Sequence, residues 1–276
     1  MPNSVNTNYG AMLALQNLNK TNRDIEMVQT RINTGLKVAG AKDDGGIFAI
    51  AQAMRADLAG LGAVKDSLNR GISTVDIALS AGEAISDLLV EMKAKALAAA
   101  DGSLDTASRT ALNEDFKALR DQIGTIVSNA TFNGINLINN STDAFQALAN
   151  ADGTSLITVL DEDLTLSGGT ISLSATASFA SMSQASDLAS TVGGDLDRLN
   201  QALARLGTAS KSLTIHQEFS TKLADEIEKG IGNLVDADLA KESARLQAFQ
   251  VKQQLGIQAL AIANQAPQSI LQFFQF

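Results

Sequence analysis

Residue types that commonly do chemistry are few in this sequence and widely spaced. It has a single histidine, His216, and no cysteine. A Cys–His nucleophile is therefore impossible, and a Ser–His–Asp triad would depend on His216 alone. His216 lies three residues from Leu213 and three from Phe219, at the edge of a helical apolar stripe, which favours a packing role. We expect no enzymatic activity and no cofactor.

Three short motifs suggest ligand binding only superficially. GLGAVK, which begins at Gly60, lacks the third glycine, the Walker spacing and the preceding strand of a phosphate-binding loop. The DDGG run at 43–46 lacks the spacing of an EF-hand, and a turn whose aspartate caps the next helix explains it better. The DED run at 161–163 is typical of a solvated loop. We predict no metal site.

The elements that would position any site are expected to be helices. Of the 276 residues 45% are hydrophobic and only 4% aromatic, and the apolar supply is mainly Ala, Leu, Ile and Val, which suits close helix packing. The two prolines, Pro2 and Pro267, stand near the two ends. Proline geometry therefore blocks no helix in between, and long helices are favoured.

Net charge and hydropathy exclude several classes of partner. A net charge of −9 argues against binding to the phosphate backbone of nucleic acids, which needs a basic surface. The first residues, MPNSVNTNYGAMLALQ, do not resemble a cleaved signal peptide. No continuous apolar run approaches the roughly 18 residues of a membrane span, so we expect no membrane insertion.

Hydrophobic periodicity predicts a chain that goes out along helices and returns. Helices are expected over 11–36, 47–100, around 112–126, from about 194 to 235, and over 238–264. The stretch 140–190 is rich in Ser, Thr, Gly and Asp, and LTLSGGTISL predicts an exposed hairpin turning at 168–169. The predicted fold class is mainly α: a long antiparallel helical bundle or coiled-coil rod with a small β-hairpin insert and paired N- and C-terminal helices.

The two ends of the chain carry apolar stripes that a two-helix pair cannot fully cover. The C-terminal helix has stripes on two nearly opposite faces and so needs partners on two sides. We therefore predict burial between molecules. The N-terminal stripe consists of Leu15, Leu18, Ile25, Val28, Ile32 and Leu36. The C-terminal stripes consist of Leu239, Leu246, Phe249, Ile257 and Leu260 on one face and Val251, Leu255 and Ile262 on the other.

Both ends of the sequence resemble bacterial flagellins. The resemblance runs through ALQNLNKTNRDIEMVQTRINTGLKVAGAKDDGGIFAIAQAMRADLAGL and TFNGINLI, and through DADLAKESARLQAFQVKQQLGIQALAIANQAPQSIL. It covers roughly 1–140 and 190–276. It implies a structural subunit that polymerises into the hollow, extracellular flagellar filament used for swimming.

The resemblance also implies a division of the chain. Residues 1–35 and 236–276 would pair as helices of the inner tube of the filament. Residues 36–140 and 191–235 would form the helical rod domain, and 141–190 a small β and loop insert.

Further partners follow from the same resemblance. The subunit would contact copies of itself, the filament cap and the hook–filament junction proteins. It would leave the cell through the flagellar type III export apparatus without a cleaved signal peptide. An export chaperone would hold the C-terminal segment, because an unpaired apolar helix is prone to aggregate.

One stretch departs from flagellins that the vertebrate innate receptor detects. In LLVEMKAKALAAADG, Lys93 keeps a positive charge, but Glu91 stands where those flagellins place arginine. The reversed charge would weaken a contact that uses arginine, so we predict weak receptor activation.

Two rival interpretations belong to other classes. A secreted effector that acts on membranes would share the amphipathic helices, and a junction protein between hook and filament would share the terminal pattern. An enzyme would have to depend on His216.

Overall fold

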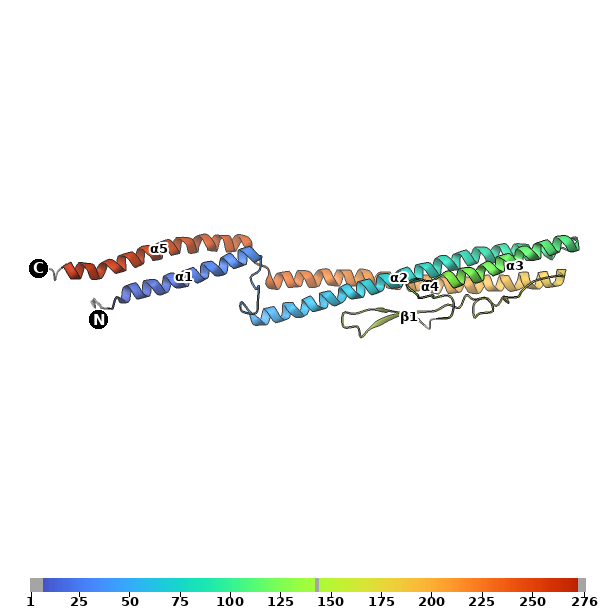
Figure 1. Ribbon diagram of the computed structural model, residues 1–276, viewed down its shortest axis with the longest axis horizontal. Helices are drawn as coiled ribbons and strands as arrows, with labels where there is room; N and C mark the ends of the chain where they lie inside the picture. The colour runs from blue at the N-terminus through green and yellow to red at the C-terminus, as the bar shows by residue number, and fades with distance from the viewer. Residues whose placement is uncertain (1–6, 142–143, 273–276) are drawn as a thin grey trace. The chain divides into compact units, whose positions relative to one another are not determined.

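The computed structural model describes residues 7–141 and 144–272, with side chains up to 265 (Figure 1). Mainly helical structure, a small hairpin and paired terminal helices, as predicted, are confirmed. The chain divides into two compact units, unit 1 (1–56 and 226–276) and unit 2 (57–225). The described elements are α1 (Tyr9–Thr34), α2 (Gly45–Ala99), α3 (Thr106–Asn129), β1 (Ala144–Leu148), β2 (Leu156–Leu160), α4 (Met182–Val235) and α5 (Leu239–Gln272).

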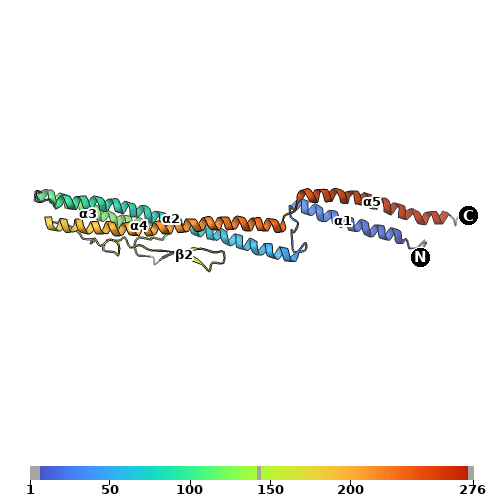
Figure 2. The ribbon, with the colours of Figure 1, turned by 180° about the vertical axis from the view of Figure 1, so that it is seen from behind.

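In unit 1, α1 and α5 lie side by side and run antiparallel (Figures 1 and 2). Asn8 caps α1 by accepting a hydrogen bond from the Ala11 amide at 3.0 Å. Gly35 ends the helix with a φ of 72°, a left-handed conformation that glycine adopts without steric cost. Beyond it the Ala237 amide donates to the Gly35 carbonyl at 2.8 Å, and the Lys37 amide donates to Val235 at 2.7 Å. Backbone bonds therefore join the segment that follows α1 to the segment between α4 and α5 at the base of the pair.

Of the two aspartates in the DDGG run at 43–46, Asp44 has the predicted capping role. The Asp44 carboxylate accepts from the amides of Gly46 and Ile47, both at 3.0 Å, at the start of α2. The Asp43 carboxylate accepts from the amides of 39 and 40 and closes the preceding turn. Asp44 thus satisfies backbone donors at the start of α2, whereas Asp43 satisfies those of the preceding turn.

The core of unit 2 is built from α2, α3, α4 and the insert. Phe116 of α3 is fully buried and meets Phe179 edge to face, with ring centroids 5.4 Å apart. Fully buried large side chains come from every part of this unit, including Leu68, Ile85, Leu89, Met92, Ile123, Leu137, Ile138, Leu164, Ile171, Leu173 and Leu199. The insert is therefore part of the core rather than an exposed appendage, contrary to the expectation from its polar composition.

The hairpin lies earlier in the insert than predicted. Strands β1 and β2 pair antiparallel, with Ala144 opposite Leu160 and Leu148 opposite Leu156. The predicted strands around 168–169 form only one isolated bridge, between Leu166 and Ile171. The predicted position of the hairpin was therefore wrong.

Side-chain capping explains why 164–173 forms a loop. The Asp163 carboxylate accepts from the amides of Thr165 and Gly169, both at 3.1 Å, and from the Thr165 hydroxyl. The buried Asp195 carboxylate of α4 accepts from the amides of Ser172 and Leu173, both at 3.0 Å. These carboxylates take the amides that a strand ladder would need.

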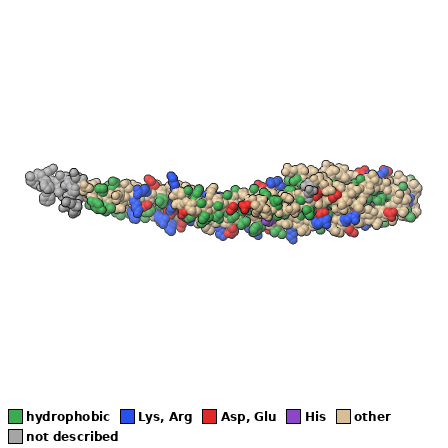
Figure 3. Space-filling model, turned by 90° about the horizontal axis from the view of Figure 1, so that it is seen from below, with side chains coloured by type: hydrophobic (Ala, Val, Ile, Leu, Met, Phe, Trp, Pro, Cys, Tyr) green, Lys and Arg blue, Asp and Glu red, His purple; other side chains and the backbone are tan. Residues whose placement is uncertain are grey.

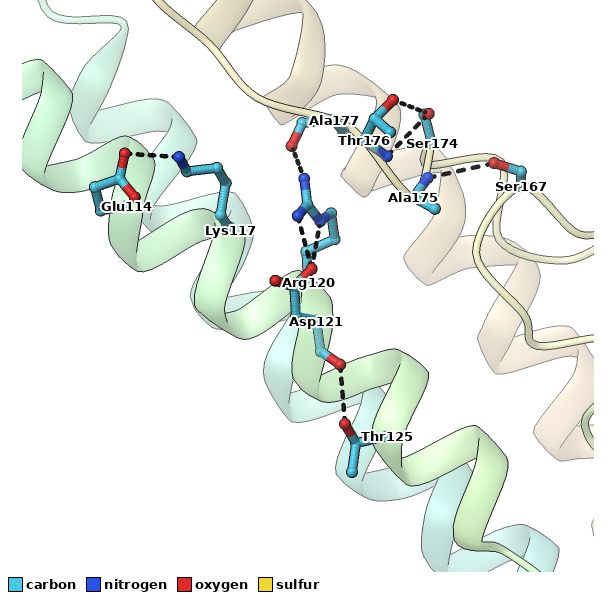
Figure 4. A network of polar contacts seen from close by, with 10 residues as sticks. All are labelled: Glu114, Lys117, Arg120, Asp121, Thr125, Ser167, Ser174, Ala175, Thr176 and Ala177. Carbon is cyan, nitrogen blue, oxygen red and sulfur yellow. Dashed lines mark hydrogen bonds and ion pairs between the residues drawn. The ribbon is translucent and has the colours of Figure 1, made fainter.

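A buried arginine connects α3 to the insert (Figure 4). The Arg120 guanidinium donates to the Ala177 carbonyl at 2.6 Å and to the Asp121 carboxylate at 2.9 and 2.6 Å. Arg120 is only 8% exposed, and these bonds compensate for burying its charge.

Helix α4 begins at Met182, about twelve residues before the predicted start. The Gln184 side chain accepts from the amides of Ala180 and Ser181, and the Ser181 hydroxyl accepts from the Gln184 amide. This is a capping box, and the SMSQ sequence carries its signature. At the other end, α5 continues to Gln272, beyond the predicted end at 264.

Helix α2 includes an 18-residue window with a mean hydropathy of 1.3, enough by length and composition alone to cross a membrane. Core helices of soluble domains pass the same test. Only 17% of this window is buried in the structure, whereas Leu68, Ile85 and Leu89 of the same helix lie in the core of unit 2.

Candidate functional site

Helices α1 and α5 meet along a seam whose residues are spaced alternately three and four apart. This spacing is the heptad pattern of coiled coils. The buried and half-buried residues that follow this spacing define the seam: Ala11, Ala14, Leu18, Thr21, Ile25, Val28 and Ile32 of α1, and Glu242, Leu246, Phe249, Gln253, Gly256, Leu260 and Ala263 of α5. A Cβ added to Gly256 would lie 3.4 Å from Leu18, so small residues bring the helices close together.

Polar contacts cross the seam at three levels. The Asn8 amide donates to the Ala263 carbonyl at 2.7 Å, and the Gln253 amide donates to the Asn22 side chain at 2.8 Å. Arg31 approaches Glu242 to 3.6 Å at the base of the pair. The seam therefore carries specific contacts as well as apolar ones.

The N-terminal residues predicted from the sequence lie mostly in this seam. Ile25 and Val28 are buried, and Leu18 and Ile32 are half-buried. Leu36 is half-buried just beyond α1, where it forms a bridge with Asp236. Leu15 is 47% exposed, because Ala14 takes the seam position four residues before Leu18.

The predicted C-terminal residues divide between the seam and the surface. Leu246, Phe249 and Leu260 are half-buried in the seam. Leu239 and Ile257 were predicted on the same face, but they are 49% and 54% exposed.

The second predicted stripe of α5 faces away from α1. Val251, Leu255 and Ile262 are 55%, 58% and 69% exposed, and at 100° per residue they lie almost opposite Gln253. Helix α1 also leaves Met12 and Met27 about half exposed. Within the described residues, the terminal helix pair thus retains apolar surface that its own partner helix does not cover.

A cluster of charged residues surrounds the base of this pair. Glu242 is 5% exposed and accepts from Arg245 at 2.9 Å, beside Arg31. These three residues, with Asp43 and Asp236, line a cleft of about 400 Å³. No group of three or more acidic or histidine side chains suited to a metal occurs in the described part of the chain.

Charge is distributed unequally between the two units. Unit 2 has 21 acidic against 11 basic residues, a net charge of −10, whereas unit 1 has 9 against 10, a net charge of +1. Figure 3 shows hydrophobic side chains at the surface among the charged ones. Apolar surface on a nearly neutral unit favours association, and the excess of like charge on unit 2 opposes it.

His216, the one candidate for catalysis, has a structural contact. Its Nε2 lies 2.7 Å from the Ala149 carbonyl oxygen, and its ring centroid lies 5.9 Å from that of Phe219. A carbonyl can only accept, so Nε2 carries the proton. His216 thereby holds the hairpin turn against α4.

The two residues of the predicted receptor patch lie on α2. Glu91 and Lys93 are both exposed. The Lys93 ammonium lies beside Gly193 of α4, where an added Cβ would be 3.2 Å from Nζ.

Sequence reasoning missed Arg31, Glu242 and the small residues of the seam. The predicted stripes contained only large apolar side chains, so the alanine, glycine and polar residues of the seam were left out. Repeating the three-and-four count with small residues included would have found the alanine and glycine positions, but not Arg31 or Glu242.

Comparison with known proteins decides the family. Residues 5–143 match the bacterial flagellin N-terminal helical region, and residues 189–274 match the bacterial flagellin C-terminal helical region. The chain belongs to the bacterial flagellin family. It is therefore a structural subunit of the extracellular flagellar filament and not an enzyme.

Similar flagellins match over their full length. The chain is 53% identical over 273 residues to Flagellin FljM of Caulobacter vibrioides, covering 99% of both chains. It is 37% identical over 285 residues to a flagellin of Brucella melitensis, again covering 99% of both. A putative flagellar hook-associated protein from Vibrio parahaemolyticus shares the fold, with a TM-score of 0.58 at 12% identity over 70% of this chain and 100% of the other.

Proposed function

We propose that the exposed apolar residues of α1 and α5 form the contacts that join neighbouring subunits in the filament. The observation that carries this proposal is the outward stripe of α5, Val251, Leu255 and Ile262, which is more than half exposed. Burying such side chains against a neighbour contributes about 1.5–3 kcal/mol each when burial is complete. The seam residues Ile25, Val28, Leu246 and Phe249 have a different role, because they hold α1 and α5 together.

The same surfaces support a division of the chain into segments with different places in the filament. We assign 1–35 and 236–276 to the inner tube of the filament, 36–140 and 191–235 to the helical rod domain, and 141–190 to the insert. The near-neutral charge of unit 1 supports this assignment, since residues packed around a common axis must tolerate close copies of themselves.

The proposed additional partners bind the same terminal helices at other stages. An export chaperone would cover the C-terminal segment before assembly, and the filament cap and the junction proteins would meet the terminal pair at the filament ends. The exposed stripe supports this order, because one apolar surface can have only one occupant at a time. Export itself would use the flagellar type III apparatus.

Truncation tests the assembly proposal directly. We expect variants that lack 1–35 or 236–276 to stay monomeric under salt conditions in which the full chain forms filaments visible by electron microscopy. Circular dichroism should show that the remaining helices persist, because the core of unit 2 lies within 57–225. Normal filaments from either truncated variant would refute the proposal.

A separate proposal concerns innate recognition. The exposed Glu91 supports weak receptor activation, because an acidic side chain repels the acidic partner that an arginine would attract. We expect Glu91→Arg to raise the response in a reporter-cell assay, while Glu91→Gln raises it less. A wild-type response as strong as that of an enteric flagellin would contradict this proposal.

A further inference from the structure

Glu242 is a buried carboxylate in a seam that is otherwise uncharged. The other seam residues of α5 are Leu246, Phe249, Gln253, Gly256, Leu260 and Ala263. Glu242 is only 5% exposed, and its Oε1 atom lies 3.6 Å from Arg31 of α1 and 2.9 Å from Arg245 of its own helix. A carboxylate removed from water is costly unless a cation compensates for the lost hydration. The position therefore requires basic neighbours.

Apolar burial alone would not determine which helix pairs with α5. From residue 243 to 272 the helix has no acidic residue and only two basic ones, Arg245 and Lys252. A second copy of α5 offers the same leucine, phenylalanine and small residues as a first. Two α5 helices could thus bury seams of similar size, and nothing apolar would favour α1 over a second α5.

The neutral polar residue in the middle of the seam does not discriminate either. Gln253 donates to Asn22 in the observed pair. In a pair of α5 helices centred on this residue, Gln253 would face a second Gln253. Two amides satisfy each other as well as an amide satisfies asparagine.

Glu242 does discriminate between the two partners. In a parallel pair of α5 helices, two copies of Glu242 would lie next to each other as buried like charges, each compensated only by its own Arg245 and not by a cation from the partner helix. In an antiparallel pair sharing the same seam, Glu242 would face the end near Leu260 and Ala263, which has no basic residue. Only α1 brings Arg31 to this position, because Arg31 lies in its last turn.

We propose that the Arg31–Glu242 ion pair is a specificity device that makes α5 pair with α1 and prevents α5 from pairing with the α5 of a second copy. This inference rests on the proposed role of the terminal helices in assembly. Subunits kept from pairing α5 with α5 retain the outward stripe for contacts of the correct geometry. A buried polar position that selects the partner at some cost in stability is well known in coiled coils.

The test uses the full chain, whose lack of cysteine makes introduced thiols unambiguous. Gln253→Cys reports pairing between two α5 helices, since residue 253 would lie close to its counterpart in either orientation. The key variant adds Arg31→Leu and Glu242→Leu to this reporter. Under mild oxidation at low salt, we expect about tenfold or more disulfide-linked dimer compared with the reporter alone. Glu242→Gln, which removes the charge and keeps the shape, should give a smaller increase.

Two controls distinguish an increase in α5–α5 dimer from misfolding and from nonspecific hydrophobic association. A Cβ at Gly256 would lie 3.9 Å from the Leu18 Cβ, within the roughly 3.5–4.5 Å range of disulfides. Leu18→Cys with Gly256→Cys should therefore form an intrachain disulfide, which shows that α1 and α5 still pair. The exposed pair Glu226–Lys229, at 3.5 Å, is the matched control when both residues are changed to leucine.

The outcomes are decisive. Unchanged dimer in the Arg31→Leu, Glu242→Leu variant overturns the proposal, as does an equal increase in the Glu226→Leu, Lys229→Leu control. Salt-induced polymerisation of the unmodified chain tests the proposed function separately. Filaments without a change in α5 cross-linking would leave that function standing and remove only the specificity device.

Discussion

Replacing the outward stripe of α5 is the sharpest test of the assembly surface. Val251, Leu255 and Ile262 are 55%, 58% and 69% exposed, so roughly half to two-thirds of each side chain remains to be buried by a neighbour. Complete burial of such a side chain contributes about 1.5–3 kcal/mol, so the three together should contribute about 3–5 kcal/mol per subunit. Since about 1.4 kcal/mol is a factor of ten, changing all three to glutamine should raise the critical concentration by about a hundredfold to a few thousandfold.

Glutamine suits this experiment because it favours helix at least as strongly as the residues it replaces. The critical concentration is measured by pelleting filaments after salt-induced assembly across a range of protein concentrations. The matched control is glutamine at Leu156 and Leu160 of β2, which are 46% and 68% exposed but lie in the insert. A critical concentration within threefold of wild type for the α5 variant would refute the reasoning. An equally large effect of the β2 control would also refute it, because general surface hydrophobicity would then explain the loss.

Three further predictions follow from charge and packing. Raising the ionic strength from about 0.01 to 0.15 M shortens the Debye length from about 30 to 8 Å. This should lower the critical concentration for assembly, because salt screens the net charge of −10 on unit 2. Light scattering measures the change. Burial alone would raise the pKa of Asp163, but hydrogen bonds from Thr165 and Gly169 outweigh it and hold that pKa below its usual value of 3.8. This stabilisation is present above pH 3.8 and is lost as pH falls through the lower folded-state pKa, so Asp163→Asn should reduce thermal stability at pH 7 and approach wild type in strong acid. Phe116→Ala should cost about 3–5 kcal/mol in a urea titration, because it empties a fully buried site against Phe179.

The helices were predictable from sequence because their signals are local. Long proline-free stretches with apolar residues at helical spacing predicted each helix, and Asp43–Asp44 and Gly35 marked their ends. The start of α4 was missed because its first turns bury Ala185 and Ala189 rather than large residues. A search for capping residues would have found Ser181 and Gln184.

The insert was harder to predict because its structure depends on contacts far apart in sequence. The amides of Ser172 and Leu173 look available for a strand until Asp195, more than twenty residues later, accepts from them. The same holds for the position of Phe179, which is fixed by Phe116 of α3. Alternation of apolar residues predicted the presence of a hairpin, but tertiary contacts decided its place.

The candidate surface was partly predictable, because the periodicity of apolar residues is local but the contacts between helices are not. Periodicity showed that α5 has two apolar faces, and the structure assigns Val251, Leu255 and Ile262 to the one turned away from α1. It could not show that Ile257 falls outside the seam, because seam membership there depends on the close approach that Gly256 permits. Leu239 keeps the seam spacing but is exposed at the first residue of α5. Glu242 gave no signal at all, since a glutamate in the first turn of a helix usually interacts with the helix dipole in solvent.

The charge distribution identifies which part of the subunit must supply cohesion. Copies of unit 2, each with a net charge of −10, repel one another when they are brought together, whereas copies of unit 1 carry only +1. In the proposed assembly, favourable free energy of polymerisation comes largely from apolar burial at the terminal helices. Helix α5 supplies that surface almost without charge, which also makes it the segment most prone to pair wrongly. In our proposal, the ion pair between half-buried Arg31 and buried Glu242 at its base restricts that pairing while leaving the opposite apolar face free. Cohesion and specificity are thus placed on the same helix but on different faces, so each can be removed by mutation without the other.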